Sequence, residues 1–138
     1  MASGAVGGCA VFAGGEINVT QGDGSGMVDV FCFGSGGALT RTVTEMSVRR
    51  YELAAAVADN SVCFGGGNIG VGGSDLAGAR RIDCIDVTTL AWKKANMKLA
   101  HVRLAAGVSR TVNSTGGAQT EVCWGGGGRN TTVECFAT

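Results

Sequence analysis

The chain contains no proline, one histidine, one tyrosine and few charged residues. Charged side chains make up 16% of its 138 residues, whereas soluble domains average about 25%. Basic and acidic residues balance at 11 each, and Lys and Arg never occur in runs longer than two. The sequence therefore lacks the concentrated positive face that binding to nucleic-acid phosphates requires.

A long apolar segment is also missing. The longest apolar run, residues 53–58, is far too short to span a bilayer, which takes about 20 residues. The first residues, MASGAVGGCAVFAGG, lack the basic region and extended apolar core of a secretion signal, so any such signal is expected outside this sequence. The 25 glycines instead predict short strands joined by tight turns, in a chain of one-domain size.

Two short stretches recur along the chain. The first is an apolar run ending in glycines, which reads AVFAGG at 10–15, VCFGGG at 62–67 and VCWGGG at 122–127. The second follows each of these and reads VDVF at 28–31, IDCI at 82–85 and VECF at 133–136. Because the second stretch alternates apolar and polar residues, it predicts strands with one polar face.

Alanine-rich runs form a third repeated feature. They cover Leu53–Val57 and Leu104–Val108, and the partly similar stretches 46–49 and 99–103 precede them. A helix is the rival interpretation of LAAAVA. We expect strands, because the runs are short, Gly107 interrupts the later one and no amphipathic window extends either.

One repeat unit therefore contains four predicted strands. Within it, RYELAAAV, VCFGGG and IDCIDVTTLAW resemble the repeat of the kelch family, in which paired glycines end the second strand and a tryptophan of the fourth packs onto the blade. Four strands in about 50 residues make one propeller blade. The resemblance covers nearly the whole chain and implies an all-β fold, a β-propeller of kelch-like four-stranded antiparallel blades that is incomplete in this chain.

The implied blades cover residues 1–46, 47–97 and 98–138 of a single propeller segment. The first has no tryptophan at the place of Trp92, so Leu39 or Val43 is expected to fill that space. The third ends after its third strand, which leaves about two and three-quarter blades where closed propellers have about four to eight. We expect a segment of a longer polypeptide, with self-association through open blade edges as the alternative.

The six cysteines fall into register when the repeats are aligned. Cys63 and Cys123 share one position of the second strand, and Cys84 and Cys135 share one of the third. In the first repeat, Cys9 lies two residues before the equivalent position of the second strand, and Cys32 lies two residues after the equivalent position of the third. Together the two shifts preserve both register and face in an antiparallel pair. Opposed Cβ atoms lie about 4.5–5.5 Å apart, close to the about 3.8 Å of a disulfide. The predicted pairs are Cys9–Cys32, Cys63–Cys84 and Cys123–Cys135. The alternative is that the cysteines fill small buried positions as thiols.

Three Asn-x-Ser/Thr triplets point to the same compartment as the disulfides. They begin at Asn18, Asn113 and Asn130, and the first and last fall in the loop predicted between the second and third strands. An exposed loop tolerates a glycan. We therefore expect a secreted or extracellular glycoprotein, with a reducing compartment as the alternative.

Catalytic and cofactor motifs are absent from the sequence. The sole histidine, His101, is interpreted as a rim residue, and the oxidases built on kelch-type propellers use several histidines and tyrosines where this chain has His101 and Tyr51. The glycine runs lack the lysine and Ser/Thr of a phosphate-binding loop. We therefore expect no cofactor, no metal and no catalysis.

The predicted function is a non-catalytic extracellular structural or interaction module that binds protein or glycan partners. The alternative is part of a propeller enzyme, carbohydrate-processing or oxidase in type, with its active-site residues outside this segment. An intracellular substrate adaptor would require reduced cysteines.

Overall fold

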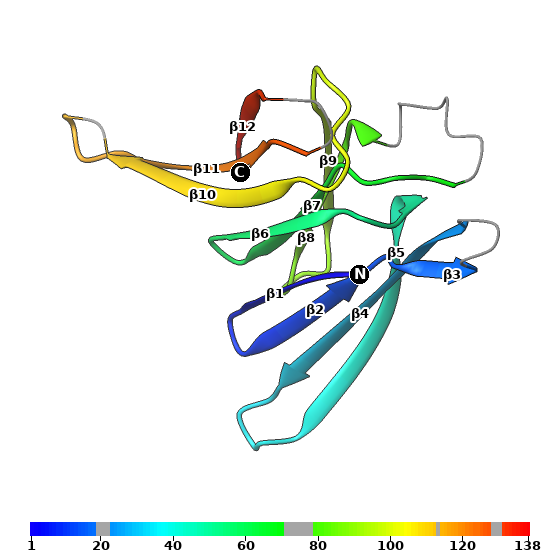
Figure 1. The fold of residues 1–138 in the computed structure, drawn as a ribbon. Helices are drawn as coiled ribbons and strands as arrows, with labels where there is room; N and C mark the ends of the chain where they lie inside the picture. Colours follow the sequence, from blue (N-terminus) through cyan, green and yellow to red (C-terminus); the bar gives the residue numbers. More distant parts are fainter. Residues whose placement is uncertain (19–22, 71–78, 113, 128–130) are drawn as a thin grey trace.

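The computed structural model describes residues 1–18, 23–70, 79–112, 114–127 and 131–138. These residues form strands arranged in three antiparallel sheets, so the predicted all-β class is confirmed. No sheet closes on itself within the described residues. Figure 1 shows the three sheets one above the other, in the order of the chain.

The first sheet contains the longest strands. Its order is β1 (Ala2–Val6), β2 (Cys9–Ala13), β4 (Asp23–Phe33) and β5 (Leu39–Arg50), and β3 (Glu16–Asn18) pairs with the beginning of β4. β5 continues beyond the boundary predicted at residue 46, because β4 still pairs with it where Ser25 lies opposite Arg50. The first sheet therefore extends to Arg50, the residue that connects it to the second sheet.

The second and third sheets differ by one strand. The second has the order β6 (Ala54–Ala58), β7 (Ser61–Gly65), β8 (Arg81–Asp86) and β9 (Trp92–Asn96). The third has the order β10 (Ala105–Val112), β11 (Ala118–Gly125) and β12 (Val133–Ala137). Both alanine-rich runs are strands, as predicted, and within the described residues β12 is the edge of a three-stranded sheet.

Every sheet has two distinct faces. Since side chains alternate along a strand, the aromatic residue of the second strand and the neighbouring cysteine point to opposite sides. We call them the aromatic face, which carries Phe12, Phe64 or Trp124, and the disulfide face, which carries the cysteine pair.

The hydrophobic core lies between the sheets. One cluster joins the disulfide face of the first sheet, with Val11 and Val30, to the aromatic face of the second, with Phe64. A second cluster joins the disulfide face of the second sheet, with Cys63, to the aromatic face of the third. The contacts between sheets run mainly through their first strands, since β6 touches both β1 and β10. Successive sheets thus pack aromatic face on disulfide face.

Glycine allows the closest approach between two sheets. A Cβ at Gly65, the last residue of β7, would collide with the indole Nε1 of Trp124 in the third sheet. A Cβ at Gly4 would lie 2.8 Å from side-chain atoms of Val57 and Val62 in the second sheet. These contacts explain why glycine occupies these two positions of the disulfide faces.

Trp92 packs against the core between the first two sheets. Its indole Nε1 donates a hydrogen bond to the hydroxyl of Thr44 in β5, at 3.2 Å. The prediction that Leu39 or Val43 fills the equivalent place in the first sheet is wrong, because the strand register puts Arg41 in that place. The side chains of Leu39 and Val43 lie on the same face of β5 and are 57% and 51% exposed.

Candidate functional site

Three disulfides join the second strand of each sheet to the third strand of the same sheet. They join Cys9 to Cys32, Cys63 to Cys84 and Cys123 to Cys135, and each pair is directly opposed in the strand register. These are the pairs that the alignment of the repeats predicts. Their Cα atoms lie 3.9 to 4.0 Å apart. The described residues contain no free cysteine.

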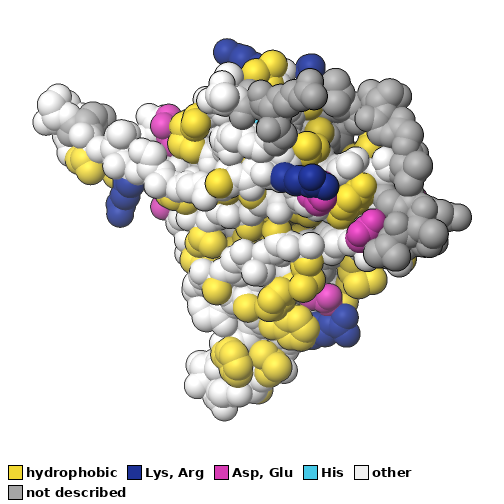
Figure 2. All heavy atoms as spheres, viewed as in Figure 1, with side chains coloured by type: hydrophobic (Ala, Val, Ile, Leu, Met, Phe, Trp, Pro, Cys, Tyr) yellow, Lys and Arg dark blue, Asp and Glu magenta, His cyan; other side chains and the backbone are white. Residues whose placement is uncertain are grey.

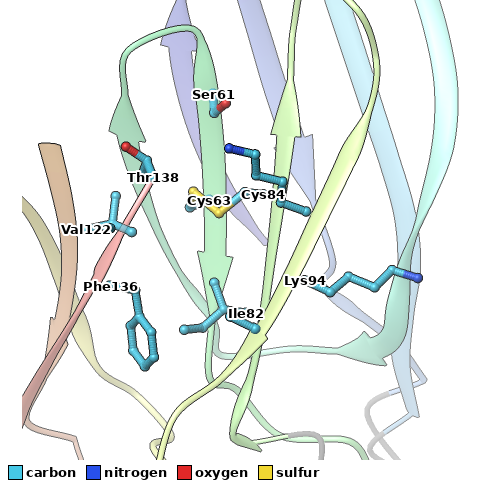
Figure 3. A pocket seen from close by; sticks show the side chains of 11 residues that line it. Ser61, Cys63, Ile82, Cys84, Lys94, Val122, Phe136 and Thr138 are labelled. Atoms are coloured by element: carbon cyan, nitrogen blue, oxygen red, sulfur yellow. A yellow bond between two sulfur atoms is a disulfide. The ribbon is translucent and has the colours of Figure 1, made fainter. Parts of the chain in front are cut away.

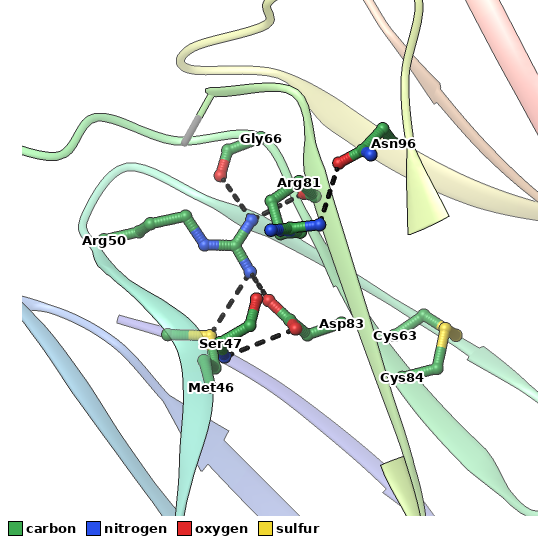
Figure 4. Close-up of polar contacts among 9 residues, drawn as sticks. All are labelled: Met46, Ser47, Arg50, Cys63, Gly66, Arg81, Asp83, Cys84 and Asn96. Carbon is green, nitrogen blue, oxygen red and sulfur yellow. Dashed lines mark hydrogen bonds and ion pairs between the residues drawn. A yellow bond between two sulfur atoms is a disulfide. The ribbon is translucent and has the colours of Figure 1, made fainter. Parts of the chain in front are cut away.

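A buried arginine connects the first sheet to the second (Figure 4). Arg50 and Asp83 are both fully buried, and the guanidinium Nη2 lies 2.6 Å from the Asp83 carboxylate. The Nη1 group donates to the carbonyls of Gly66, at 3.0 Å, and Arg81, at 2.6 Å. The backbone carbonyl of Arg50 accepts a hydrogen bond from the amide of Gly15 in the first sheet. We call this arrangement the first joint.

The arginine of the first joint stays charged at neutral pH. Burial lowers the pKa of Arg50 to about 10, although the neighbouring Asp83 opposes that effect. This pKa remains far above neutral pH, so the guanidinium keeps its charge there. Removing either partner would leave the other charge buried and unpaired, which is far more costly than losing an exposed ion pair.

A histidine occupies the same position between the second and third sheets. His101 is fully buried, so the prediction of a rim residue is wrong. Its Nδ1 lies 3.1 Å from the carbonyl of Gly126, and its Nε2 lies 3.4 Å from the carboxylate of Glu134. Both partners are hydrogen-bond acceptors, and a ring nitrogen donates to its partner when it carries a proton. The carbonyl of His101 accepts from the amide of Gly67. We call this arrangement the second joint.

The two joints have the same arrangement of residues and contacts. Arg50 and His101 precede the first strand of the following sheet, and each binds a glycine carbonyl and the acidic residue opposite the buried aromatic residue of that sheet. A Cβ at Gly66, whose φ is 66°, would collide with the carbonyl of His101. The paired glycines thus let the connecting chain cross closely from one sheet to the next.

Glu134 is held as a carboxylate. Burial raises its pKa, but the backbone amides of Lys98 and Leu99 and the side chain of His101 outweigh this effect, so that the pKa lies below its usual range. The two amides donate at 2.6 and 2.9 Å. Glu134 therefore holds in place both the side chain of His101 and the chain segment that leads into the third sheet.

Among the described residues, no other sheet packs on the aromatic face of the first sheet. Phe12 packs edge-on against Phe31, and the guanidinium of Arg41 lies over the Phe31 ring. Arg41 also pairs with Asp29 at 2.7 Å. The equivalents of Phe12 and Asp29 in the other sheets are Phe64 with Asp83 and Trp124 with Glu134.

Large apolar side chains surround this cluster. They come from alternate positions of β4 and β5 and are more than half exposed: Met27 51%, Phe33 68%, Leu39 57% and Val43 51%. Figure 2 shows hydrophobic side chains gathered over the part of the molecule where Figure 1 draws β2, β4 and β5. The first sheet thus presents an open apolar face with one ion pair on it.

The predicted glycosylation residues are only partly visible. Asn18 is the last residue of β3, so the connection before β4 contains a short strand. Asn113 and Asn130 lie outside the described residues. Across the described ranges, no group of three His, Cys, Asp or Glu side chains is placed to hold a metal ion. Nor does this part of the chain contain a helix of the length and apolarity that a bilayer crossing needs.

Comparison with protein-family models finds none that matches the chain, and comparison with curated proteins finds no significant match. The resemblance to the kelch family thus depends on the repeated residues themselves.

Proposed function

We propose that the chain is a non-catalytic extracellular structural or interaction module, a segment of a propeller of kelch-like blades that binds protein or glycan partners. The aromatic face of the first sheet, on which no other sheet of the described residues packs, carries this proposal. Its equivalents in the second and third sheets are covered by a neighbouring sheet, which leaves Phe64 and Trp124 fully buried. A contiguous exposed apolar surface is typical of an interaction site.

The three disulfides support the extracellular setting. Disulfides persist in oxidising compartments and are rare where glutathione keeps thiols reduced. The adjacency of the first strands β1, β6 and β10 supports radial packing of blades about an axis.

Binding of the oxidised chain to a glycan array and to panels of extracellular proteins tests the function. Phe31→Glu on the open face is expected to weaken the observed binding by at least about tenfold, as removal of a central aromatic contact does. Val112→Glu is the matched control, because Val112 is 67% exposed in β10 of the third sheet. Failure to bind any member of either set, or equal loss in both variants, would contradict the proposal.

A further inference from the structure

The outer strand of the first sheet, β5, has one unpaired side within the described residues. It is 12 residues long and pairs only with β4 (Figure 1). The chain enters β5 from β4 and leaves it for β6, and the structure describes both connections. The unpaired edge therefore belongs to an internal strand of the chain.

The odd-numbered residues of β5 direct their backbone groups away from β4. Alternate residues of a strand bond to opposite neighbours in an antiparallel ladder. The amide of Phe33 in β4 donates to the carbonyl of Gly8 on the β2 side, so the even-numbered residues of β4 bond to their even-numbered partners in β5. The amide of Ser47 accordingly points outward and donates to the carboxylate of Asp83 in the second sheet. Before it, among the described residues, a free edge remains at Arg41, Val43 and Glu45.

The side chains of this free edge are complementary to a second copy of the same edge. When two β5 strands pair antiparallel about a two-fold axis at Val43, Arg41 of each copy lies opposite Glu45 of the other. Thr42 then lies opposite Thr44 on the other face. Opposite charges and threonine pairs stabilise directly opposed positions, and the two-fold symmetry repeats each pair.

The charges leave little choice of register. Arg41 is 55% exposed, and Glu45 is exposed and forms no ion pair among the described residues. An axis at Arg41 or at Glu45 would place like charges opposite each other, which destabilises a pair of strands. The axis at Val43 is the arrangement that pairs both charges with their opposites.

The outer strand of the second sheet, β9, lacks this complementarity. Lys94 occupies the place of Val43, because Lys94 lies opposite Asp83 as Val43 lies opposite Asp29. An axis at that place would put Lys94 opposite its own copy. Figure 3 shows Lys94 projecting away from the pocket between the second and third sheets, beside β12. Lysine and short length both hinder edge-to-edge pairing, and β9 has only five residues.

We infer that two copies of the chain dimerise through β5, with their free edges paired antiparallel about a two-fold axis at Val43. The pairing satisfies the outward backbone groups of both copies and joins the two first sheets into one. Because this axis is perpendicular to the sheet, both aromatic faces lie on the same side. The inference goes beyond the proposed function, since the second copy occupies the edge and leaves both aromatic faces open to a partner.

Sedimentation of the oxidised chain alone, over a series of concentrations, tests the dimer. A reversible equilibrium between monomer and dimer is expected. Val43→Lys gives β5 the residue that β9 has and is expected to weaken dimerisation at least about tenfold, because like charges meet at the axis. Val112→Lys is the matched control and is expected to change nothing, since Val112 is 67% exposed in β10. Formation of the three disulfides checks the folding of both variants.

Charge reversal tests the register. Glu45→Arg and Arg41→Glu are each expected to weaken dimerisation of the chain that carries them. A mixture of the two variants is expected to form a heterodimer, because every charge then faces its opposite. Hydrogen exchange in the dimer is expected to slow at the amides of residues 41, 43 and 45, whereas those of 40, 42 and 44 bond to β4 in both states.

Four results would overturn the inference. They are a chain that stays monomeric throughout the series, a dimer that Val43→Lys leaves equally strong, and a mixture of the reversed variants that forms no heterodimer. The fourth is slow exchange of amides 41, 43 and 45 in the monomer, because another segment of the chain would then occupy the edge.

Discussion

The first and second joints make the same connections with different side chains. Arg50 and Asp83 are both fully buried, at an N–O distance of 2.6 Å, and Trp92 packs against the core between the same two sheets. His101 and Glu134 lie 3.4 Å apart, Glu134 is 12% exposed, and a pocket remains open between the same two sheets. The second joint is thus looser in both its polar and its apolar parts.

The two pairs of sheets also differ in the strands that the structure describes. The fourth strand of the second sheet carries the tryptophan that packs against the first core, whereas among the described residues the last strand of the third sheet is β12. We conclude that the basic residue of each joint positions the next sheet, and that the fourth strand of that sheet completes the packing between the two sheets.

The largest expected effect is a loss of unfolding free energy when the acidic residue of the fully buried first joint is replaced by its amide. Asp83→Asn leaves Arg50 buried without a counter-charge and is expected to lower the free energy of unfolding by about 3–5 kcal/mol. Glu134→Gln, the matched change in the second joint, is expected to cost less, about 1.5–3 kcal/mol, the usual value for hydrogen bonds to a charged group. Urea unfolding of both oxidised variants measures the difference. Equal losses would contradict the comparison.

Close packing provides the next test. Gly65→Ala forces a methyl group against the Trp124 indole and is expected to destabilise the chain by about 1–3 kcal/mol, as overpacking does. Gly107→Ala is the control, since a Cβ at Gly107 meets no atom within 4 Å. Adding Trp124→Phe should rescue Gly65→Ala, because it shortens the ring and removes an indole Nε1 that is buried without a hydrogen-bond partner. Ala13 with Phe64 is the natural version of that pair in the first core. Thermal unfolding checks the set, and a double variant no better than Gly65→Ala would argue against it.

The exposure of the disulfides predicts an order of reduction. Cys123–Cys135 lies on the disulfide face of the third sheet, on which no other sheet of the described residues packs, whereas Cys63 is fully buried between sheets. Because thiol attack requires access to sulfur, limited reductant is expected to open Cys123–Cys135 first. Alkylation followed by peptide mapping measures the order. Earlier opening of Cys63–Cys84 would contradict the assignment of covered and open faces.

The smallest effect is a pH dependence confined to the second joint. The lowered pKa of Glu134 means that its carboxylate stabilises the fold fully above the unfolded value of about 4.3. That contribution is lost as the pH falls through the lower, folded-state value. The difference in unfolding free energy between the chain and its Glu134→Gln variant is therefore expected to shrink below about pH 4. A difference that is constant down to pH 2 would oppose this role for Glu134.

The strand pattern and the disulfides could be predicted from the sequence because both depend on period and register. Alternation identified β4, β8 and β12, and opposed cysteines follow from aligning the repeats. Arg50 and His101 could not be assigned in this way, since a basic residue before a strand usually lies in solvent. The repeated order RYEL and HVRL, with Asp83 and Glu134 equally placed downstream, is the signal that would have found both joints.

The packing of side chains between sheets was harder to predict from the sequence. Leu39 and Val43 were expected to replace Trp92 within the first sheet, but tertiary position decides their exposure. The pocket beside β12 likewise has no signature of its own in the sequence, because its walls come from two sheets.

The contact between Gly65 and Trp124 tests the stacking of the sheets most directly. With two tryptophans in the chain, the indole resonances can be assigned through Trp92→Phe. The stacked arrangement predicts a strong nuclear Overhauser effect between the indole N–H of Trp124 and the α-protons of Gly65, whose shifts also feel the aromatic ring. An indole N–H of Trp124 that shows no such effect and exchanges rapidly with water would contradict the packing of aromatic face on disulfide face.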